Sequence, residues 1–581
     1  MDNKFLFLSD LNEQQREVCI SDKSTILTAC PGSGKTRTLI YRLAYLEACF
    51  PNSNRLNLAI TYTNRAAEEI KDRLAQLGID SKTTWAGTIH QFCLQFILRP
   101  YGLYSERLKN GYHIIDEFIQ QSYLSEICSK LGIEVGFNCP PPLSNPTVKR
   151  AYDRLLVQHR EIDFDMILIL SKSLLQENQF ISSNISGILR SIHIDEYQDT
   201  NELQYDIISL ISNTKSEMPV FFIGDKNQAI YGGIGGIAKD APELNRMFHR
   251  TFDEKILNGC YRSSQRIIDY YSNFQVTHTE IRSLSMQKES IGIISHNRRC
   301  DKSALASEIA KIISKQLQEG IPASEICVVA PQWWMLFAIS KDLREKLPLV
   351  NFDAPDITPI KYDPLNVFYL IARIVFTEAG KNSGRRKHLA SDILTLLSDE
   401  FQIKISDTID GRDVLKCLNS TLRIADDGIK TLKNSCQLLM DYLHVDFQND
   451  ALLGKAYEDF FAKVDDRIKR YKLSSDTPSF ERCFKEKTGV VINTCTGVKG
   501  EEYTTVIAFG LLNGYLPHWD IIINQSQSVR RCESLKLLYV IGSRAKEKLF
   551  LISEQGHCTN SGNPYTPTNE IMNICFVYNT D

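Results

Sequence analysis

Apolar and polar positions alternate in two ways along the first ninety residues. Short apolar runs at Ser24–Ala29 and Leu56–Thr61 are each followed by a longer segment with helical spacing, Lys35–Cys49 and Ala66–Leu77. Strands that alternate with helices in this way predict a parallel sheet covered by helices. We therefore expect the chain to begin with an α/β lobe.

The pattern becomes mainly helical after Arg99, with a break at the prolines of positions 140–142. Strand candidates resume at Ser191–Ile194 and Val220–Ile223. We therefore expect a helical segment, from Pro100 to about Gly187, to be inserted into the first lobe.

A second group of short apolar runs follows, and a long helical stretch divides it. Its members are Ile326–Ala330, Val490–Asn493, Thr505–Phe509 and Leu549–Ile552. The sequence thus predicts an α/β fold of two lobes, each interrupted by a helical insertion. The expected parts are 1–99 with 188–258 (first lobe), 100–187 (its insertion), 259–362 with 478–581 (second lobe) and 363–477 (second insertion).

Composition excludes several classes of protein. The chain has 581 residues, of which 43% are hydrophobic and 24% charged, which is typical of soluble globular proteins. Its formal net charge is −3, so any contact with nucleic acid must come from a local patch. No apolar run of about 18 residues occurs, and the N-terminal apolar stretch is too short for a secretory signal, so we expect no contact with a membrane. The 16 scattered cysteines form no C-x-x-C pair, which favours reduced thiols and a cytoplasmic location.

The turn after the first predicted strand has the spacing of a phosphate-binding loop. It reads Ala29-Cys30-Pro31-Gly32-Ser33-Gly34-Lys35-Thr36, with Ala in place of the usual first glycine. Glycines let successive N–H groups point at phosphate oxygens, and the following helix adds its positive end. Lys35 would hold the β- and γ-phosphates of ATP, and the Thr36 hydroxyl would bind Mg²⁺.

Two adjacent carboxylates follow the strand candidate Ser191–Ile194. Asp195 can hold Mg²⁺, and Glu196 can orient and deprotonate an attacking water. An acidic capping turn is the alternative interpretation, which the upstream phosphate loop makes less favourable.

Further motifs, in order from Leu11 to Arg544, resemble those of superfamily 1 helicases of the UvrD/Rep type, whose lobes are RecA-like. The strings that carry the resemblance are LNEQQ (11–15), AITYTNRAAEE (59–69), GTIH (87–90), GDKNQAIYG (224–232), YRSS (261–264), VKGEEY (498–503) and YVIGSRA (539–545). A small-molecule phosphoryl kinase would share the phosphate loop but leaves these other strings unexplained.

This resemblance implies roles in binding and hydrolysing ATP. Gln15 would read the adenine edge, Arg37 and Tyr261 would sandwich the ring, and Glu502 would contact the ribose. Gln228 would sense the γ-phosphate, and Arg262 and Arg544 would bring positive charge to it from the second lobe. Full catalysis would then require the two lobes to close on the nucleotide.

The same resemblance implies a single-stranded DNA path. Aromatic groups stack on bases and polar groups hold phosphates. The implied DNA-contacting residues are Tyr62, Thr63, Asn64, His90, Tyr231 and Thr496. Tyr62 and Tyr231 could instead be half-buried packing residues.

Two departures from the family pattern lie between the ATP and DNA positions. Where the family has a stacking aromatic followed by arginine, this chain has Gly233 and Ile234. Where the family has His-Ser, it has Thr496 and Gly497. Because the hydrolytic residues are intact, ATP hydrolysis is a firmer prediction than processive unwinding.

Two functions remain open from the sequence. The first is a DNA helicase that moves 3′ to 5′ on single-stranded DNA and separates a tailed duplex. The second is a DNA- or nucleotide-sensing ATPase that regulates a partner nuclease and unwinds little. The second insertion is short, and we expect no room for a fused nuclease domain. In these respects the chain resembles compact helicases of antiphage systems such as Gabija, which act beside a nuclease subunit. The basic cluster at 385–388 is read either as a solvated loop or as a contact for DNA or a partner.

Overall fold

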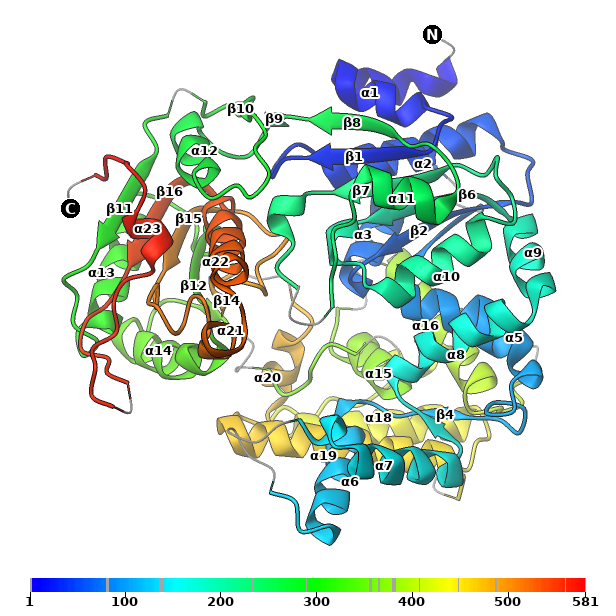
Figure 1. Ribbon diagram of the computed structural model, residues 1–581. Helices are drawn as coiled ribbons and strands as arrows, with labels where there is room; N and C mark the ends of the chain where they lie inside the picture. Colours follow the sequence, from blue (N-terminus) through cyan, green and yellow to red (C-terminus); the bar gives the residue numbers. More distant parts are fainter. Residues whose placement is uncertain are drawn as a thin grey trace. The chain divides into compact units, whose positions relative to one another are not determined.

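The computed structural model describes residues 3–79, 83–134, 141–231, 235–288, 290–354, 358–363, 366–378, 383–406, 408–447, 449–485, 488–559 and 561–579 (Figure 1). The chain forms two compact units. The first comprises Met1–Ile321, Glu325–Leu336 and Thr494–Asp581, and the second Pro322–Ser324 and Phe337–Asn493. Both predicted lobes contribute to the first unit.

The first lobe contains a parallel sheet, as the sequence predicts, and this sheet has six strands where the sequence indicates four. Its order is β3-β2-β6-β7-β1-β8. The strands are β1 (Thr25–Ala29), β2 (Leu56–Thr61), β3 (Thr84–Thr88), β6 (Leu189–Asp195), β7 (Val220–Gly224) and β8 (Asp253–Leu257). The middle strands are almost entirely buried because helices cover both faces of the sheet.

The helices of this lobe start where the sequence supplies caps. Asn12 and Asn201 each accept from the amide three residues later and form capping boxes with Gln15 and Gln204. The helical elements are η1 (Asn3–Asp10), α1 (Glu13–Ile20), α2 (Lys35–Cys49), α3 (Asn64–Gln76), α4 (Ile89–Cys93), η2 (Leu94–Leu98), α5 (Arg99–Tyr101), η3 (Gly102–Tyr104), η5 (Tyr197–Asp199), α10 (Glu202–Ser212), η6 (Lys226–Gln228) and α11 (Ala241–Phe248).

The insertion predicted at 100–187 is mainly helical. It contains α6 (Glu117–Lys130), η4 (Pro142–Ser144), α7 (Pro146–His159), α8 (Phe164–Glu177) and α9 (Gln179–Ile188). It also contains a parallel pair of two-residue strands, β4 (His113–Ile114) and β5 (Glu161–Ile162). Strands so short have no periodicity and cannot be predicted from the sequence.

The second lobe contributes four parallel strands to the first unit, in the order β11-β16-β15-β12. They are β11 (Ile293–Asn297), β12 (Ile326–Ala330), β15 (Tyr503–Ala508) and β16 (Ala545–Ile552), and a short parallel pair joins β9 (Gly259–Cys260) to β10 (Arg282–Ser283). The helical elements are α12 (Gln265–Ser272), α13 (Leu305–Gln318), η8 (Ala323–Glu325), α14 (Trp333–Lys346), α21 (Trp519–Asn524), α22 (Gln527–Gly542) and α23 (Asn569–Met572).

The second unit has its own apolar core, in which α15 is buried on nearly all sides. Its elements are β13 (Phe352–Asp353), which pairs with β14 (Val490–Thr494), and α15 (Val367–Val375), α16 (Ser383–Asp399), α17 (Gly411–Asn419), α18 (Gly428–Tyr442), α19 (Ala451–Tyr471) and α20 (Thr477–Arg482). The predicted second insertion, 363–477, falls within this unit, and the predicted domain boundaries themselves stay predictions.

The basic cluster at 385–388 is not a solvated loop. It lies in α16, and Arg386 is buried. Its guanidinium donates to the backbone oxygen of Ile374 at 3.1 Å and to Asn419 Oδ1. Because the last carbonyls of a helix lack internal partners, this cation stabilises the end of α15. The side chain thus has a structural role that a charge pattern alone does not reveal.

No helix within the described ranges is long and apolar enough to cross a membrane. The described cysteines are free thiols, and Cys139 lies outside the described residues.

A buried cation, Arg42 of α2, joins α1 to the first sheet. Its Nε donates to Nε2 of His193 at 3.0 Å, and its Nη1 donates to the backbone oxygens of Cys19 and Ser21. His193 Nδ1 lies 3.1 Å from the oxygen of Leu58, so a neutral imidazole that donates from Nδ1 satisfies both contacts. Burial, and then the neighbouring Arg42, lower the pKa of His193 to about 3.

This arrangement predicts a pH-dependent contribution of His193 to stability. The unfolded chain binds a proton at the ordinary histidine pKa of about 6.5, whereas the folded chain does not. The stabilisation is therefore present above that pH and is lost as the pH falls through it. We expect the melting temperature of His193→Gln to lie below that of the unmodified chain at about pH 7.5, and the gap to narrow towards about pH 5.

The matched control is His278→Gln, since His278 is exposed. Its melting temperature should follow that of the unmodified chain at each pH. A gap for His193→Gln that is constant with pH would contradict the neutral, buried imidazole.

Candidate functional site

The predicted catalytic residues gather at the carboxyl ends of the central strands of the first sheet. The phosphate loop follows β1, Asp195 ends β6, and Asp225 follows β7. These strands are neighbours in the sheet although they are far apart in sequence. The carboxyl edge of an open parallel sheet is where α/β proteins bind ligands, so the fold itself brings the motifs together.

The phosphate loop is shaped by close contact with the second lobe. Gly32 has a left-handed backbone with φ of 71°, and its oxygen accepts from the amide of Tyr261 at 2.8 Å. A Cβ at position 32 would lie 2.5 Å from Cβ of Arg262, so glycine is required sterically as well as conformationally. Ser33 Oγ closes the turn by donating to the oxygen of Cys30 at 2.7 Å.

Helix α2 begins at Lys35, directly after this loop, and has no acidic residue in its first turn. The N-terminal end of such a helix carries unpaired N–H groups and a partial positive charge. With the side chains of Lys35 and Thr36 at the same end, the arrangement suits an anionic phosphate chain.

The two adjacent carboxylates have different environments although both are largely shielded from solvent. Glu196 Oε1 lies 3.7 Å from Lys35 Nζ, and its Oε2 accepts from the Gln198 amide. Burial by itself would raise the pKa of Glu196, but Lys35 and Lys499 outweigh burial and hold that pKa below its usual range. Burial, followed by the negative charge of Glu196, raises the pKa of Asp195 instead. The two lysines thus favour the ionised form of Glu196, which is the form that can accept a proton from water.

The backbone at Glu196 is strained. Its φ of 52° lies in the left-handed region, which is costly for a residue with a Cβ. The turn directs the Glu196 side chain toward Lys35, and its amide donates to Asp195 Oδ1 at 3.0 Å. Such outliers gather at functional sites, where the surrounding structure enforces them.

The residues predicted to hold a metal supply only oxygen donors. Asp195 and Thr36 offer a carboxylate and a hydroxyl beside the phosphate loop. Mg²⁺ is usually bound by one or two such groups together with phosphate oxygens and water. The donor chemistry therefore fits Mg²⁺, although the described residues contain no group of three or more side chains able to hold a metal on their own.

Arg544 of the second lobe enters this site as a buried cation. Its Nη2 donates to Gln228 Oε1 at 3.0 Å, and its remaining N–H groups donate to the oxygens of Val540 and Glu501 and to Ser543 Oγ. Burial lowers its pKa to about 9, which leaves it charged at neutral pH. The amide of Gln228 in turn donates to Asp225 Oδ2 at 2.8 Å, so one chain of polar contacts crosses between the lobes.

Arg262 lies against the phosphate loop. Its Nε donates to Glu502 Oε2 at 2.7 Å, and its Nη1 donates to the oxygen of Ser543 at 2.8 Å. The two predicted catalytic arginines thus share Ser543 as a partner. Arg262 donates to the backbone oxygen of Ser543, and Arg544 donates to its hydroxyl oxygen.

The residues predicted around adenine converge on the turn before α1. Arg37 Nη2 donates to the oxygen of Asp10 at 3.0 Å, and Tyr261 Oη accepts from Asn12 Nδ2 at 2.8 Å. Gln15 is buried, and its Nε2 donates to the oxygen of Ser33 in the phosphate loop. Glu502 pairs with Arg262. The roles of these four side chains toward adenine and ribose stay predictions.

Two predicted DNA-contacting residues stack on each other. The rings of Tyr62 and Tyr231 lie 4.8 Å apart at 22°. Tyr231 Oη donates to the oxygen of Thr496 at 3.5 Å, and Lys499 Nζ lies 5.2 Å from the Tyr231 ring centre. The packing interpretation is therefore correct in part, since each ring covers the other, while Tyr62 remains 38% exposed.

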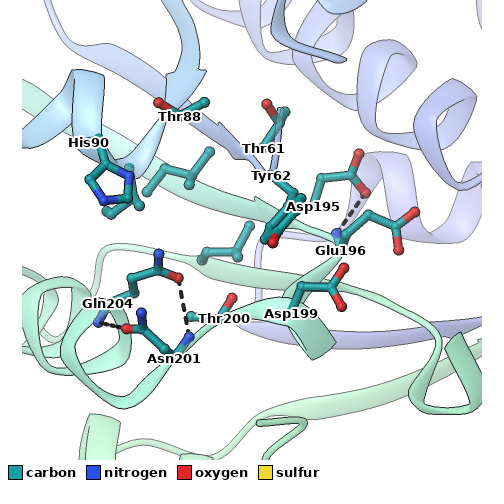
Figure 2. A pocket seen from close by; sticks show the side chains of 13 residues that line it. Thr61, Tyr62, Thr88, His90, Asp195, Glu196, Asp199, Thr200, Asn201 and Gln204 are labelled. Atoms are coloured by element: carbon teal, nitrogen blue, oxygen red, sulfur yellow. Dashed lines mark hydrogen bonds between the residues drawn. The ribbon is translucent and has the colours of Figure 1, made fainter. Parts of the chain in front are cut away.

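A pocket of about 320 Å³ is lined by the two carboxylates and by two of the predicted DNA residues, Tyr62 and His90. Figure 2 shows His90 on one side of it and Asp195 and Glu196 on the other. Burial lowers the pKa of His90 to about 4, so this ring is neutral near pH 7. The lining residues are Ile60, Thr61, Tyr62, Thr88, Ile89, His90, Ile194, Asp195, Glu196, Asp199, Thr200, Asn201 and Gln204.

Thr63 and Asn64 lie at the start of α3. Thr63 Oγ1 caps this helix by accepting from the amide of Ala66 at 3.2 Å. Asn64 Oδ1 is buried, with no hydrogen-bond partner in the part of the chain that the structure describes. Gly233 and Ile234, where the sequence departs from the family pattern, lie outside the described residues.

Sequence reasoning missed the role of Lys499. Its ammonium donates to Asp199 Oδ2 and to the oxygen of Gln228, and it also faces the Tyr231 ring. It thereby links the turn after β6, the turn after β7 and the stacked tyrosines. The string VKGEEY contains this lysine, but neither spacing nor charge indicates that it spans three elements.

Comparison with known proteins agrees with this geometry. Residues 11–136 and 144–237 match a family model described as the UvrD/REP helicase N-terminal domain. The match contains the phosphate loop, the paired carboxylates and Gln228. The comparisons do not address an antiphage setting or a nuclease partner, and both stay predictions.

Relatives extend the similarity to the rest of the chain. A probable DNA helicase II homolog of Mycoplasma capricolum is 25% identical over 94% of this chain and 84% of its own length. The ATP-dependent DNA helicase PcrA of Staphylococcus aureus is 29% identical over 45% of this chain and 39% of its own length. The PcrA helicase of Staphylococcus epidermidis is 28% identical over 44% of this chain and 38% of its own length. Together with the site at the first sheet and its arginines from the second lobe, these matches support a UvrD/Rep-like helicase of superfamily 1.

Proposed function

We propose that this chain is a DNA helicase that hydrolyses ATP to move 3′ to 5′ along single-stranded DNA and to separate a tailed duplex. One observation carries the proposal: groups from both lobes meet at a single nucleotide site. Arg544 contacts Gln228, and Arg262 lies against Gly32 of the phosphate loop. Hydrolysis at such a site is coupled to lobe movement, since the arginines and the phosphate loop belong to different lobes.

In this proposal, the side chains already described divide the chemistry. Lys35 binds the β- and γ-phosphates of ATP, and Glu196 accepts a proton from the attacking water. Arg262 and Arg544 stabilise the negative charge that develops on the γ-phosphate, an effect of about 10³-fold or more in related phosphoryl transfers. Thr36 and Asp195 would hold Mg²⁺, which when bound supplies further positive charge to the phosphates.

Lys499 supports coupling between hydrolysis and DNA binding. Its partner Gln228 also contacts Arg544, and the ring below its ammonium, Tyr231, is stacked on Tyr62. A shift of Gln228 or Arg544 on hydrolysis would therefore move the predicted base-stacking surface. The 3′-to-5′ direction rests on the resemblance alone.

A second function is favoured by one feature of the sequence. Gly233 and Ile234 replace an aromatic residue and an arginine of the family pattern, which weakens the expected grip on bases. The alternative is a sensing ATPase that regulates a partner nuclease and unwinds little on its own.

Substitution of the catalytic carboxylate tests the ATPase site. We expect Glu196→Gln to bind ATP but to hydrolyse it about 10²- to 10⁴-fold more slowly, because the proton acceptor is lost. Lys35→Ala should abolish turnover. Both effects are measured as steady-state phosphate release alongside ATP binding.

Glu202→Gln is the matched control for this change, because exposed Glu202 pairs with Lys239 at the start of α10. Its rate should equal that of the unmodified chain. Near-normal turnover by Glu196→Gln would show that the proton acceptor is another group.

Strand displacement separates the two functions. We expect the purified chain to separate a duplex with a 3′ single-stranded tail when ATP and Mg²⁺ are present, and to leave a 5′-tailed duplex intact. Single-stranded DNA should also stimulate its ATPase. DNA-stimulated hydrolysis without displacement of either substrate would favour the sensing ATPase.

Restoring the family residues tests the DNA path directly. We expect Gly233→Tyr combined with Ile234→Arg to bind single-stranded DNA about fivefold or more tightly, since one added base stack contributes about 1–3 kcal/mol. Fluorescence anisotropy of a labelled oligonucleotide measures the change. Gly233→Ala with Ile234→Ala controls for stiffening of the backbone, and an affinity equal to that of this control would place the loop away from the DNA.

A further inference from the structure

Three positively charged side chains gather on the first lobe, at the amino ends of strands β2, β6 and β7. Arg55 directly precedes β2, Arg190 is the second residue of β6, and Lys215 lies in the turn between α10 and β7. These strands are neighbours in the parallel sheet, so their amino ends lie at one edge (Figure 1). From this edge β6 runs to Asp195 at the ATP site, a distance of about 15 Å at roughly 3.3 Å per residue.

An aromatic ring holds the guanidinium of Arg190. The central carbon of this group lies 3.8 Å from the centre of the Phe50 ring, which directly follows α2. Arg190 Nε is buried and has no hydrogen-bond partner in the part of the chain that the structure describes. Stacking thus orients the cation, while its terminal N–H groups remain available to an acceptor.

The turn that carries Lys215 is held by a further arginine. Arg250 donates through Nη2 to the oxygen of Ser212 at 2.8 Å and through Nη1 to the oxygen of Met218. The amide of Met218 in turn donates to the oxygen of Lys215 at 3.1 Å. The backbone of this turn is therefore fixed on both sides of Lys215, and Arg250 adds positive charge to the same edge.

The three cations repel one another. Burial, followed by the positive charge of Arg55, lowers the pKa of Arg190 and that of Lys215. Within the described ranges, none of the three takes part in an ion pair. Unpaired charges of one sign that are partly withdrawn from water are unfavourable, and an anion that bridges them relieves both effects.

The nearest carboxylates do not fill this role. Glu47 attracts Arg190, but it is buried and accepts from the amide of Thr83 at 3.1 Å and from the hydroxyl of Thr84 at 2.6 Å. Glu217, which attracts Lys215, has an exposed side chain. The edge therefore keeps an excess of positive charge that is available to a ligand.

We propose that Arg55, Arg190 and Lys215 form a second phosphate site on the first lobe, which binds the linked phosphates of a free diphosphate. The planar arginine groups suit pairs of phosphate oxygens, and the lysine adds a compact charge. Inorganic pyrophosphate and the diphosphate end of a nucleotide share this chemistry. The proposal is independent of the proposed function, since it uses no residue of the ATP site or the predicted DNA path.

Pyrophosphate binding to the whole chain tests the site. The background is Lys35→Ala, which removes the lysine that would hold phosphates at the ATP site. We expect isothermal titration of this variant to show one pyrophosphate site. Adding Arg190→Gln and Lys215→Gln should weaken its affinity about tenfold or more, because two charge-assisted contacts are lost.

The matched control removes the same charge elsewhere on the first lobe. In the Lys35→Ala background, Lys109→Gln with Lys130→Gln replaces two exposed lysines that pair with Glu106 and Glu126. This control should keep the affinity for pyrophosphate. Melting temperatures check that each variant folds. If the Arg190 variant does not fold, Arg55→Gln decides the question, since this side chain is exposed and its loss should still weaken binding.

Titration of ADP in the same variants distinguishes the two sources of the diphosphate. If the substitutions at Arg190 and Lys215 weaken ADP and pyrophosphate alike, the phosphates alone are recognised. A larger loss for ADP identifies a nucleotide as the ligand.

Three results would overturn the proposal. In the first, Lys35→Ala alone abolishes pyrophosphate binding, which would place all of it at the ATP site. In the second, the variant with Arg190→Gln and Lys215→Gln binds as tightly as the control. In the third, these substitutions weaken binding of a labelled blunt duplex and leave pyrophosphate unaffected, which would make the cluster a DNA contact. None of these results decides strand displacement, so the proposed function is judged separately.

Discussion

The arrangement of the ATP site depends on a buried positive charge that crosses from one lobe to the other. Arg544 is 2% exposed, and burying an unpaired guanidinium would cost far more free energy than the fold could tolerate. Its partners are therefore obligatory: two backbone oxygens, the Ser543 hydroxyl and the amide oxygen of Gln228. Gln228 belongs to the first lobe and the other three partners to the second, so contact between the lobes completes the hydrogen bonding of this cation. The same contact places Arg544 beside the turn that follows β7.

Several parts of this arrangement follow from the sequence. The alternation of apolar runs with helical segments predicts parallel strands, and the limits of β2, α2 and β12 coincide with their predicted ranges. The phosphate loop and paired carboxylates could be placed at strand ends, since their spacing reflects local backbone chemistry. Strands β3, β8 and β11 could not be found in this way. β8, for example, reads Asp-Glu-Lys-Ile-Leu and lies at the sheet edge, where charged residues are tolerated.

Contacts between distant segments could not be predicted from the sequence for a different reason. Arg42 and Arg386 look like ordinary surface residues of amphipathic helices, yet both are buried and hold carbonyl groups at the ends of other helices. Lys499 likewise acquires its role only because three separate turns surround it. Periodicity indicates which side of a helix or strand is apolar. It does not indicate which polar groups on a neighbouring element lack a hydrogen-bond partner.

Position 196 separates what the fold prefers from what the chemistry requires. Glycine would adopt the left-handed backbone there without the steric penalty of about 1–2 kcal/mol that a side chain incurs. Stability alone would thus favour glycine directly after β6. Glutamate at this position therefore incurs a steric cost, which its proposed role as proton acceptor would explain. A stabilised version of this protein, designed by relaxing its unfavourable torsions, would lose its proposed proton acceptor among the first changes made.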